Sequence, residues 1–163
     1  MRTTTLGTNG PEVGVIGLGC MGMSYAYDMD AEHDDETSIS VIRGAIDLGA
    51  TLIDTADVYG PYTNEELVGR ALQDGYRDRA VLSTKVGLEV STATKGSGTM
   101  PGLTPNGRPE HIRESIDASL QRLGTDHVDL YLLHRVDPQV PLEDSWGAMA
   151  RAVQDGKARA IGL

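Results

Sequence analysis

Short apolar stretches alternate along the chain with longer segments in which apolar residues recur every three or four positions. The short stretches predict strands at residues 13–18, 51–54, 80–84, 128–133 and 158–163. The periodic segments between them predict helices at residues 37–49, 65–73, 110–124 and 142–154. Strands that alternate with helices in this way indicate parallel βα units with right-handed crossovers and the helices on the outside.

The N-terminal segment leaves two arrangements open. Residues 2–6 and 13–18 flank a turn at Thr8-Asn9-Gly10-Pro11, so they either pair as a hairpin or follow one another as successive strands. The glycine-rich connection at residues 17–23 resembles part of a dinucleotide-binding fingerprint. Its pattern does not complete and no helix begins there at once, so we favour a flexible turn after a strand.

Polar residues end three successive predicted strands, namely Asp54, Lys85 and His134, and Tyr59 follows Asp54 on the same connection. The active groups of a (β/α) barrel cluster at the carboxyl ends of several strands. This distribution favours an α/β fold of the (β/α)8 TIM-barrel type over an open doubly wound sheet. Because eight strands typically take about 250 residues, we expect an incomplete barrel, with an N-terminal hairpin, about five parallel strands and four helices in a single domain at residues 1–163.

Three local predictions complete this architecture. Asn64 is expected to cap the helix at 65–73, since asparagine is a favoured N-cap residue. Residues 88–109 are rich in glycine, proline and hydroxyl side chains without a sustained period, which predicts a long loop beside the strand ends. On the helix at 142–154, four residues are expected to face the core: Trp146, Met149, Ala150 and Val153.

The composition narrows the classes of protein to which the chain can belong. A formal net charge of −10 and a pI near 4.7 argue against a nucleic-acid partner, which needs a basic face. No apolar run approaches the length of a membrane span, and no apolar signal core follows Met1, so we predict no membrane partner and a cytoplasmic location. The single cysteine, Cys20, permits no internal disulfide, which agrees with a reducing compartment.

The acidic segment from Asp28 to Glu36, which includes His33, allows two interpretations. Carboxylates and a histidine are metal ligands, so a metal site is conceivable. The segment has the irregular character of a loop, however, and a solvated acidic stretch is the favoured interpretation. We therefore predict no metal site.

The polar residues at the strand ends make a chemically sensible carbonyl-reducing site. A free tyrosine has a pKa of about 10 and is a poor proton donor at neutral pH, but an adjacent cation lowers this pKa. Lys85 is the candidate cation beside Tyr59, and Asp54 would hold it charged and in place. His134 is suited to hydrogen-bond the substrate oxygen. Each residue alone is more often structural, so the prediction depends on their joint position, and Asp57 is given no catalytic role.

The motifs around these residues resemble those of the aldo-keto reductases, over nearly the whole chain. The resemblance is carried by residues 49–60 with Asn64-Glu65, by residues 83–85 and by residues 129–134. The sequence His-Arg-Val-Asp-Pro at 134–138 is closest to that of bacterial members of the family.

The resemblance implies a role for each candidate residue. Tyr59 would be the proton donor, Lys85 and Asp54 would tune it, and His134 would orient the carbonyl of a small-molecule substrate. NADPH would give the hydride, which no side chain supplies. Three residues would lie beside the nicotinamide end of the cofactor: Cys20, Met21 and Asp54.

In the aldo-keto reductases, further strands carry the groups that hold the carboxamide and the adenosine phosphate. The resemblance therefore implies that the chain is cut after the fifth barrel strand. Two functions remain open: an NADPH-dependent oxidoreductase that reduces aldehyde or ketone carbonyls to alcohols, or a non-catalytic half-barrel that self-associates or binds a partner through its open sheet edge. Methylglyoxal-like aldehydes, pyridoxal and sugar-derived carbonyls all remain open as substrates.

Overall fold

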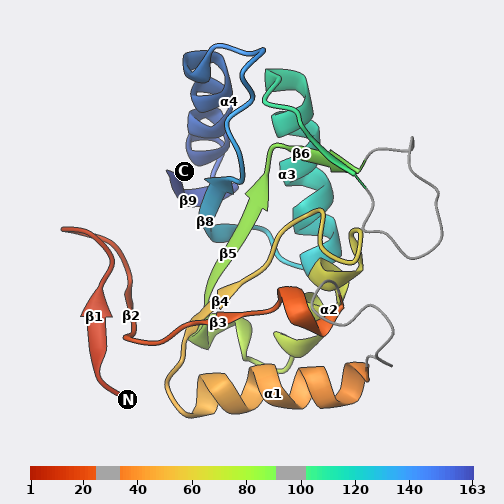
Figure 1. Ribbon diagram of the computed structural model, residues 1–163. Helices are drawn as coiled ribbons and strands as arrows, with labels where there is room; N and C mark the ends of the chain where they lie inside the picture. Colours follow the sequence, from red (N-terminus) through yellow and green to blue (C-terminus); the bar gives the residue numbers. More distant parts are fainter. Residues whose placement is uncertain (25–33, 91–101) are drawn as a thin grey trace.

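A five-stranded parallel sheet with helices packed on it organises the chain (Figure 1). The computed structural model describes residues 1–24, 34–90 and 102–163. The strands follow one another across the sheet in chain order: β3 (Leu18–Gly19), β4 (Leu52–Asp54), β5 (Val81–Val86), β8 (Val128–Leu133) and β9 (Ala158–Gly162). All neighbouring pairs are parallel, so all carboxyl ends lie at one edge of the sheet.

Four α-helices follow the strands in the predicted alternation: α1 (Asp35–Asp47), α2 (Thr63–Ala71), α3 (Pro109–Leu123) and α4 (Leu142–Gln154). Each helix contacts the next, so they form a row along the sheet (Figure 1). The core lies between the sheet and the helices, where Ile53, Leu82 and Tyr131 from the strands and Ile112 and Met149 from the helices are fully buried. Burying side chains of this size is worth roughly 1.5–3 kcal/mol each.

The order of the strands distinguishes the favoured barrel type from an open doubly wound sheet. A doubly wound sheet reverses its strand order at a switch point, whereas β3-β4-β5-β8-β9 never reverses. The sheet face away from the helices is only partly buried at Leu52, Leu130 and Leu132. Within the described ranges, β3 and β9 each pair along one side only, as in an incomplete (β/α) barrel.

Local signals set the ends of the helices. Asp34 caps α1, accepting hydrogen bonds from the backbone N–H groups of Glu36 and Thr37. Pro109 begins α3, where its missing N–H costs nothing, and Gly124 ends that helix in the left-handed conformation with φ of +65°.

A hairpin precedes the sheet. β1 (Thr3–Thr5) pairs antiparallel with β2 (Glu12–Gly14), so the hairpin arrangement of the N-terminal segment is the correct one (Figure 1). The strand predicted at 13–18 is two strands, because β2 belongs to the hairpin and β3 to the parallel sheet. A short 3-10 helix, η1 (Met21–Met23), follows β3 in place of a simple turn.

The prediction of one long loop at residues 88–109 is wrong at both of its ends. β6 (Leu88–Val90) pairs antiparallel with β7 (Leu103–Pro105), with Leu88 opposite Pro105. Strands of three residues are too short to give a period, and their partners are more than ten residues away in the chain. Residues 91–101 of this predicted loop lie outside the described residues.

The apolar face predicted for α4 is wrong in part. Met149 is fully buried, but Trp146 is 38% exposed and Val153 is 36% exposed. Small residues instead meet the core, namely Ser145, Ala148 and Ala152. The helix therefore has two apolar stripes, and the one with larger side chains faces away from the core.

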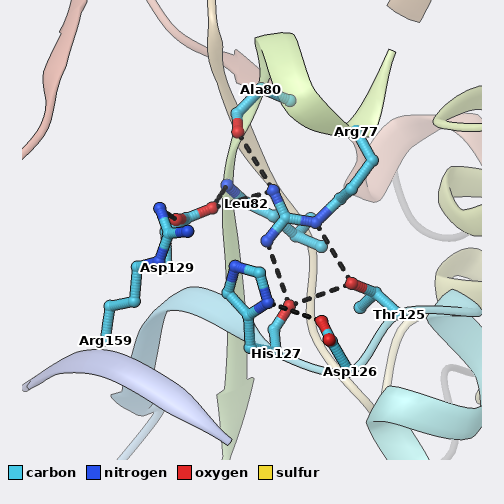
Figure 2. A network of polar contacts seen from close by, with 8 residues as sticks. All are labelled: Arg77, Ala80, Leu82, Thr125, Asp126, His127, Asp129 and Arg159. Carbon is cyan, nitrogen blue, oxygen red and sulfur yellow. Dashed lines mark hydrogen bonds and ion pairs between the residues drawn. The ribbon is translucent and has the colours of Figure 1, made fainter. Parts of the chain in front are cut away.

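A buried carboxylate joins three strands at the amino-terminal edge of the sheet (Figure 2). Asp129 on β8 accepts a hydrogen bond from the backbone N–H of Leu82 on β5 at 2.8 Å. The same carboxylate forms ion pairs with Arg77 at 3.0 Å and with Arg159 on β9 at 2.8 Å. Arg77 belongs to the 3-10 helix η2 (Arg77–Arg79) and also donates to the carbonyl oxygen of Ala80. The network holds this edge together, opposite the edge where the candidate site residues lie.

Residues 28–33 of the acidic segment lie outside the described residues, and Asp34 to Glu36 cap and open α1. Elsewhere in the described chain, no group of three or more His, Cys, Asp or Glu side chains is arranged to hold a metal ion. No helix in the described ranges combines the length and apolar character needed to cross a membrane.

Candidate active site

A lysine ammonium lies at the centre of the candidate site. Lys85 near the end of β5 donates to the Asp54 carboxylate at 2.6 Å and to the backbone carbonyl of Thr55 at 2.8 Å. β4 and β5 are neighbours, and Asp54 lies opposite Ser83 in their register. Ser83 and Lys85 are two residues apart on one strand, so their side chains point to the same face as Asp54. The lysine side chain is 15% exposed, and the paired carboxylate offsets much of the cost of burying its charge.

Tyr59 and His134 complete the arrangement that the sequence predicts. The Tyr59 hydroxyl lies 3.3 Å from Lys85 Nζ. The rings of Tyr59 and His134 meet edge to face, with centroids 5.7 Å apart. The amide of His134 donates to the carbonyl of Val86 at 2.7 Å, which continues the β5–β8 pairing to the strand end. The structure thus brings all four predicted catalytic residues together at one edge of the sheet.

A pocket of about 470 Å³ opens at this edge. It is lined mainly by apolar side chains, with Tyr59, His134 and Arg135 as its polar groups. The lining residues are Met21, Tyr59, Leu88, Leu103, Pro105, His134, Arg135 and Val136. Its volume lies within the usual range of small-molecule sites, about 300–1,000 Å³.

His134 is held in its neutral form. Burial lowers the pKa of its imidazole to about 4, and the charges of Lys85 and Arg135 act in the same direction. A neutral imidazole carries one N–H donor and one acceptor nitrogen. Its Nδ1 is buried without a hydrogen-bond partner in the described part of the chain. The site therefore carries the desolvation cost of one buried nitrogen without a described partner.

We expect His134 to stay neutral from pH 8 down to about pH 4, given its lowered pKa. The unfolded chain takes up this proton near pH 6.5, so the free energy of unfolding should fall as pH drops from about 6.5 to 4 and level off below. NMR titration of the histidine ring resonances measures the first effect, and urea unfolding at several pH values measures the second. A His134→Gln variant should lose this part of the acid dependence. A ring that titrates near pH 6.5 would disprove the assignment.

The two sequence-predicted cofactor contacts near β3 differ in their surroundings. Cys20 is fully buried in the main core, and its amide donates to the carbonyl of Asp54 at 2.8 Å. Met21 is half-buried and lines the pocket. Burial, with the nearby Asp54 charge, raises the pKa of the Cys20 thiol to about 12. Only Met21 presents its side chain to the pocket.

We expect Cys20 to be unreactive in the folded chain. Its raised pKa leaves almost no thiolate, which is the nucleophilic form, at pH 8. Labelling by a disulfide reagent should be negligible in buffer and should reach one thiol per chain in concentrated urea. Because the chain has a single cysteine, the released chromophore reports this site alone. Rapid labelling without urea would show that the region around β3 opens.

Residues 15–163 match the family model described as the aldo/keto reductase family. The chain belongs to this family. It is 42% identical to "Probable aldo-keto reductase 1" of Glycine max over 163 residues, which are 100% of this chain and 44% of that protein. The chain thus spans about half the length of the curated relative.

Solved aldo-keto reductase structures agree with the fold. An aldo-keto reductase from Bacillus halodurans, in its holo form, superimposes with a TM-score of 0.83 at 30% identity, over 99% of this chain and 49% of that one. The glycerol dehydrogenase of Gluconobacter oxydans superimposes with a TM-score of 0.77 at 32% identity, over 99% and 46% of the two chains. These matches confirm the predicted TIM-barrel fold class, with the described sheet as an incomplete barrel.

In this aldo/keto reductase chain, a further site residue that was not predicted is Ser83, whose hydroxyl donates to the second oxygen of Asp54 at 3.0 Å. Its spacing of two from Lys85 was the available signal. Asn64, predicted as a helix cap, lies one residue inside α2 and is fully buried. Its side chain accepts from Thr55 Oγ1 at 2.6 Å and donates to the Cys20 carbonyl at 2.9 Å, so it joins the connections after β3 and β4.

Two buried acids lie behind the site. Glu65 is fully buried, where it accepts from Thr84 Oγ1 at 2.6 Å and pairs with Arg122 at 2.7 Å. Asp57 is also buried, and its Oδ1 has no hydrogen-bond partner in the described chain. Burial, reinforced by the Glu65 charge, raises the pKa of Asp57 to about 8. The family motif predicted neither the burial of these carboxylates nor the effect of the Glu65 charge on the pKa of Asp57.

Proposed function

We propose that this chain holds the proton-donating site of an NADPH-dependent oxidoreductase that reduces aldehyde or ketone carbonyls to alcohols. The observation that carries the proposal is the contact of 3.3 Å between the Tyr59 hydroxyl and Lys85 Nζ, with Asp54 at 2.6 Å on the same ammonium. Such a chain of groups suits proton donation to an oxygen that becomes negative as hydride arrives.

Each residue then has a separate task. Tyr59 donates its hydroxyl proton to the carbonyl oxygen. Lys85 stabilises the tyrosinate that remains, and Asp54 holds the ammonium in place through their contact of 2.6 Å. His134, neutral because burial and the Lys85 charge lower its pKa to about 4, orients the carbonyl by a hydrogen bond without bringing a second positive charge.

The described residues fit a nicotinamide cofactor at its reactive end. When bound, NADPH supplies the hydride. Met21 lines the pocket together with Tyr59 and His134, so these three side chains would border the nicotinamide. Met21 and Asp54 would contact the nicotinamide end. Cys20 would act through the backbone that it anchors, because its thiol lies in the core.

Titration of the chain with NADPH, followed by nicotinamide fluorescence, tests cofactor binding. We expect a saturable change that NADP⁺ displaces. A Met21→Ala variant should weaken it, whereas Met149→Leu, a swap of similar volume in the core, should not. The absence of any saturable change at millimolar NADPH would contradict cofactor binding by this chain.

Three further expectations belong to this proposal. Residues 1–163 would form one domain that corresponds to the N-terminal part of the barrel. The substrate would be a small-molecule carbonyl. The cytoplasm would be the location, because a reducing compartment suits the single cysteine.

A second candidate function is self-association through the open sheet edge. β9 pairs along one side only in the described chain, and beside it the apolar side chains of Leu142, Trp146 and Leu163 border a cavity of about 320 Å³. Their exposed fractions are 37%, 38% and 68%. Light scattering tests this candidate: a folded monomer at high concentration would exclude it, and a Trp146→Glu variant should dissociate any dimer.

A further inference from the structure

An arginine follows the candidate substrate-orienting histidine directly. β8 ends at Leu133, and the backbone hydrogen bond from His134 to Val86 fixes the position of the chain directly before Arg135. Arg135 lines the same pocket as Tyr59 and His134, and it is exposed to solvent there. Burial lowers the pKa of His134, and the positive charges of Lys85 and Arg135 lower it further, so the charge of Arg135 acts on the site.

The guanidinium of Arg135 has no carboxylate partner within the described ranges. Eight other described arginines form ion pairs with carboxylates. Three acids near the pocket have other partners: Asp54 pairs with Lys85, Asp137 accepts two backbone N–H groups, and Glu89 accepts from the side-chain amide of Asn106, the residue after β7. Arg135 therefore brings to the pocket lining a positive charge that no described carboxylate pairs with.

The rest of the pocket wall is apolar. Leu88, Leu103 and Val136 line the pocket together with Tyr59 and Arg135. A ligand that fills this space would have a carbonyl at one end, a short apolar body and an anionic group at the other. Guanidinium binds carboxylates and phosphates through two parallel N–H···O bonds, which gives both affinity and orientation.

We propose that Arg135 selects carbonyl substrates that carry an anionic group, a carboxylate or a phosphate, over neutral carbonyls of the same shape. This inference rests on the proposed carbonyl reduction and names the substrate class of that same site. Arg135 acts here as a specificity-determining residue, while the transfer of hydride and proton is left to the other groups.

Two matched aldehydes test the inference: 4-carboxybenzaldehyde and its methyl ester, which differ in charge but little in shape. At low ionic strength and saturating NADPH, we expect kcat/KM to favour the acid about 10- to 100-fold, the range for a hydrogen bond to a charged group. Arg135→Gln should remove that preference, mostly through a higher KM for the acid. Arg135→Lys should retain part of it, because a lysine keeps the charge without the planar fork. Arg151→Gln, which removes an exposed charge on α4, should change neither substrate.

A second readout separates the inference from the proposed function. NMR titration with 4-(hydroxymethyl)benzoate and its methyl ester measures binding without catalysis, and we expect the acid to bind more tightly only when Arg135 is present. If both aldehydes are reduced equally well by the wild-type chain, the inference fails and carbonyl reduction stands. If neither is reduced but the acid still binds through Arg135, carbonyl reduction fails and the anion selection stands. If the acid gains nothing from Arg135 in either measurement, the inference is overturned.

Discussion

Replacing Tyr59 by phenylalanine should lower kcat for carbonyl reduction about 10²- to 10⁴-fold, the usual contribution of a positioned general acid. The variant removes only the hydroxyl that lies 3.3 Å from Lys85 Nζ. The ring would remain in its edge-to-face contact with His134, so the far-ultraviolet circular dichroism and the urea midpoint should change little. NADPH oxidation that depends on an aldehyde measures the loss.

Tyr62→Phe is the matched control for this experiment. It deletes the same hydroxyl three residues further along the same connection, from a ring that is 45% exposed and lies over Arg122 at 5.1 Å. Substitutions at exposed positions usually change the free energy of unfolding by no more than about 0.5 kcal/mol. Tyr62 is also not among the residues that line the pocket with Tyr59, so we expect its variant to have the kcat of the wild-type chain. If both tyrosine variants kept most of the activity, Tyr59 would not be the proton donor.

Replacing Asp129 by alanine should destabilise the chain by about 3–5 kcal/mol, the usual cost of removing one partner of a buried ion pair. The carboxylate is 2% exposed, and it serves Leu82, Arg77 and Arg159 together (Figure 2). The variant would leave the Leu82 N–H unsatisfied and Arg77, whose side chain is 19% exposed, without its counterion. Urea unfolding followed by circular dichroism measures the change.

Asp126→Ala provides the comparison in the same network. Asp126 contacts the His127 ring (Figure 2) at 2.6 Å. Its side chain is 93% exposed. Because solvent screens such an exposed pair, we expect the urea midpoint of this variant to stay close to that of the wild-type chain. Equal losses in the two variants would mean that the Asp129 network stabilises the sheet edge no more than a surface pair does.

The parts of the fold with local signals could be predicted from the sequence. Pro109 and Gly124 bound α3 because each acts through its own backbone, and the apolar runs of β5 and β8 need no knowledge of their neighbours. The four candidate catalytic residues came together for a similar reason. Parallel strands place their carboxyl ends at one edge, so position along the chain was sufficient to group them.

The parts that depend on distant partners were missed. Asn64 is of a residue type that is favoured at helix N-caps. Its side chain instead bonds to Thr55 and to the Cys20 carbonyl, and the residue lies inside α2. The core-facing stripe of α4 was misplaced because Ser145, a polar residue, reaches the Gly107 carbonyl at 2.6 Å and turns that side of the helix inward. These contacts join each helix to distant segments of the chain, so no pattern within the helix itself predicts them.

The proposal that Asp54, Tyr59, Lys85 and His134 form a carbonyl-reducing site can be tested by product analysis with NADPH deuterated at both C4 positions. The chain would be incubated with this cofactor and 4-carboxybenzaldehyde, and the alcohol analysed by mass spectrometry. We predict one deuterium at the alcohol carbon for each NADPH oxidised by the wild-type chain, and almost none from the folded Tyr59→Phe variant in the same time. No deuterated alcohol from the wild-type chain, or equal amounts from both proteins, would contradict the claim.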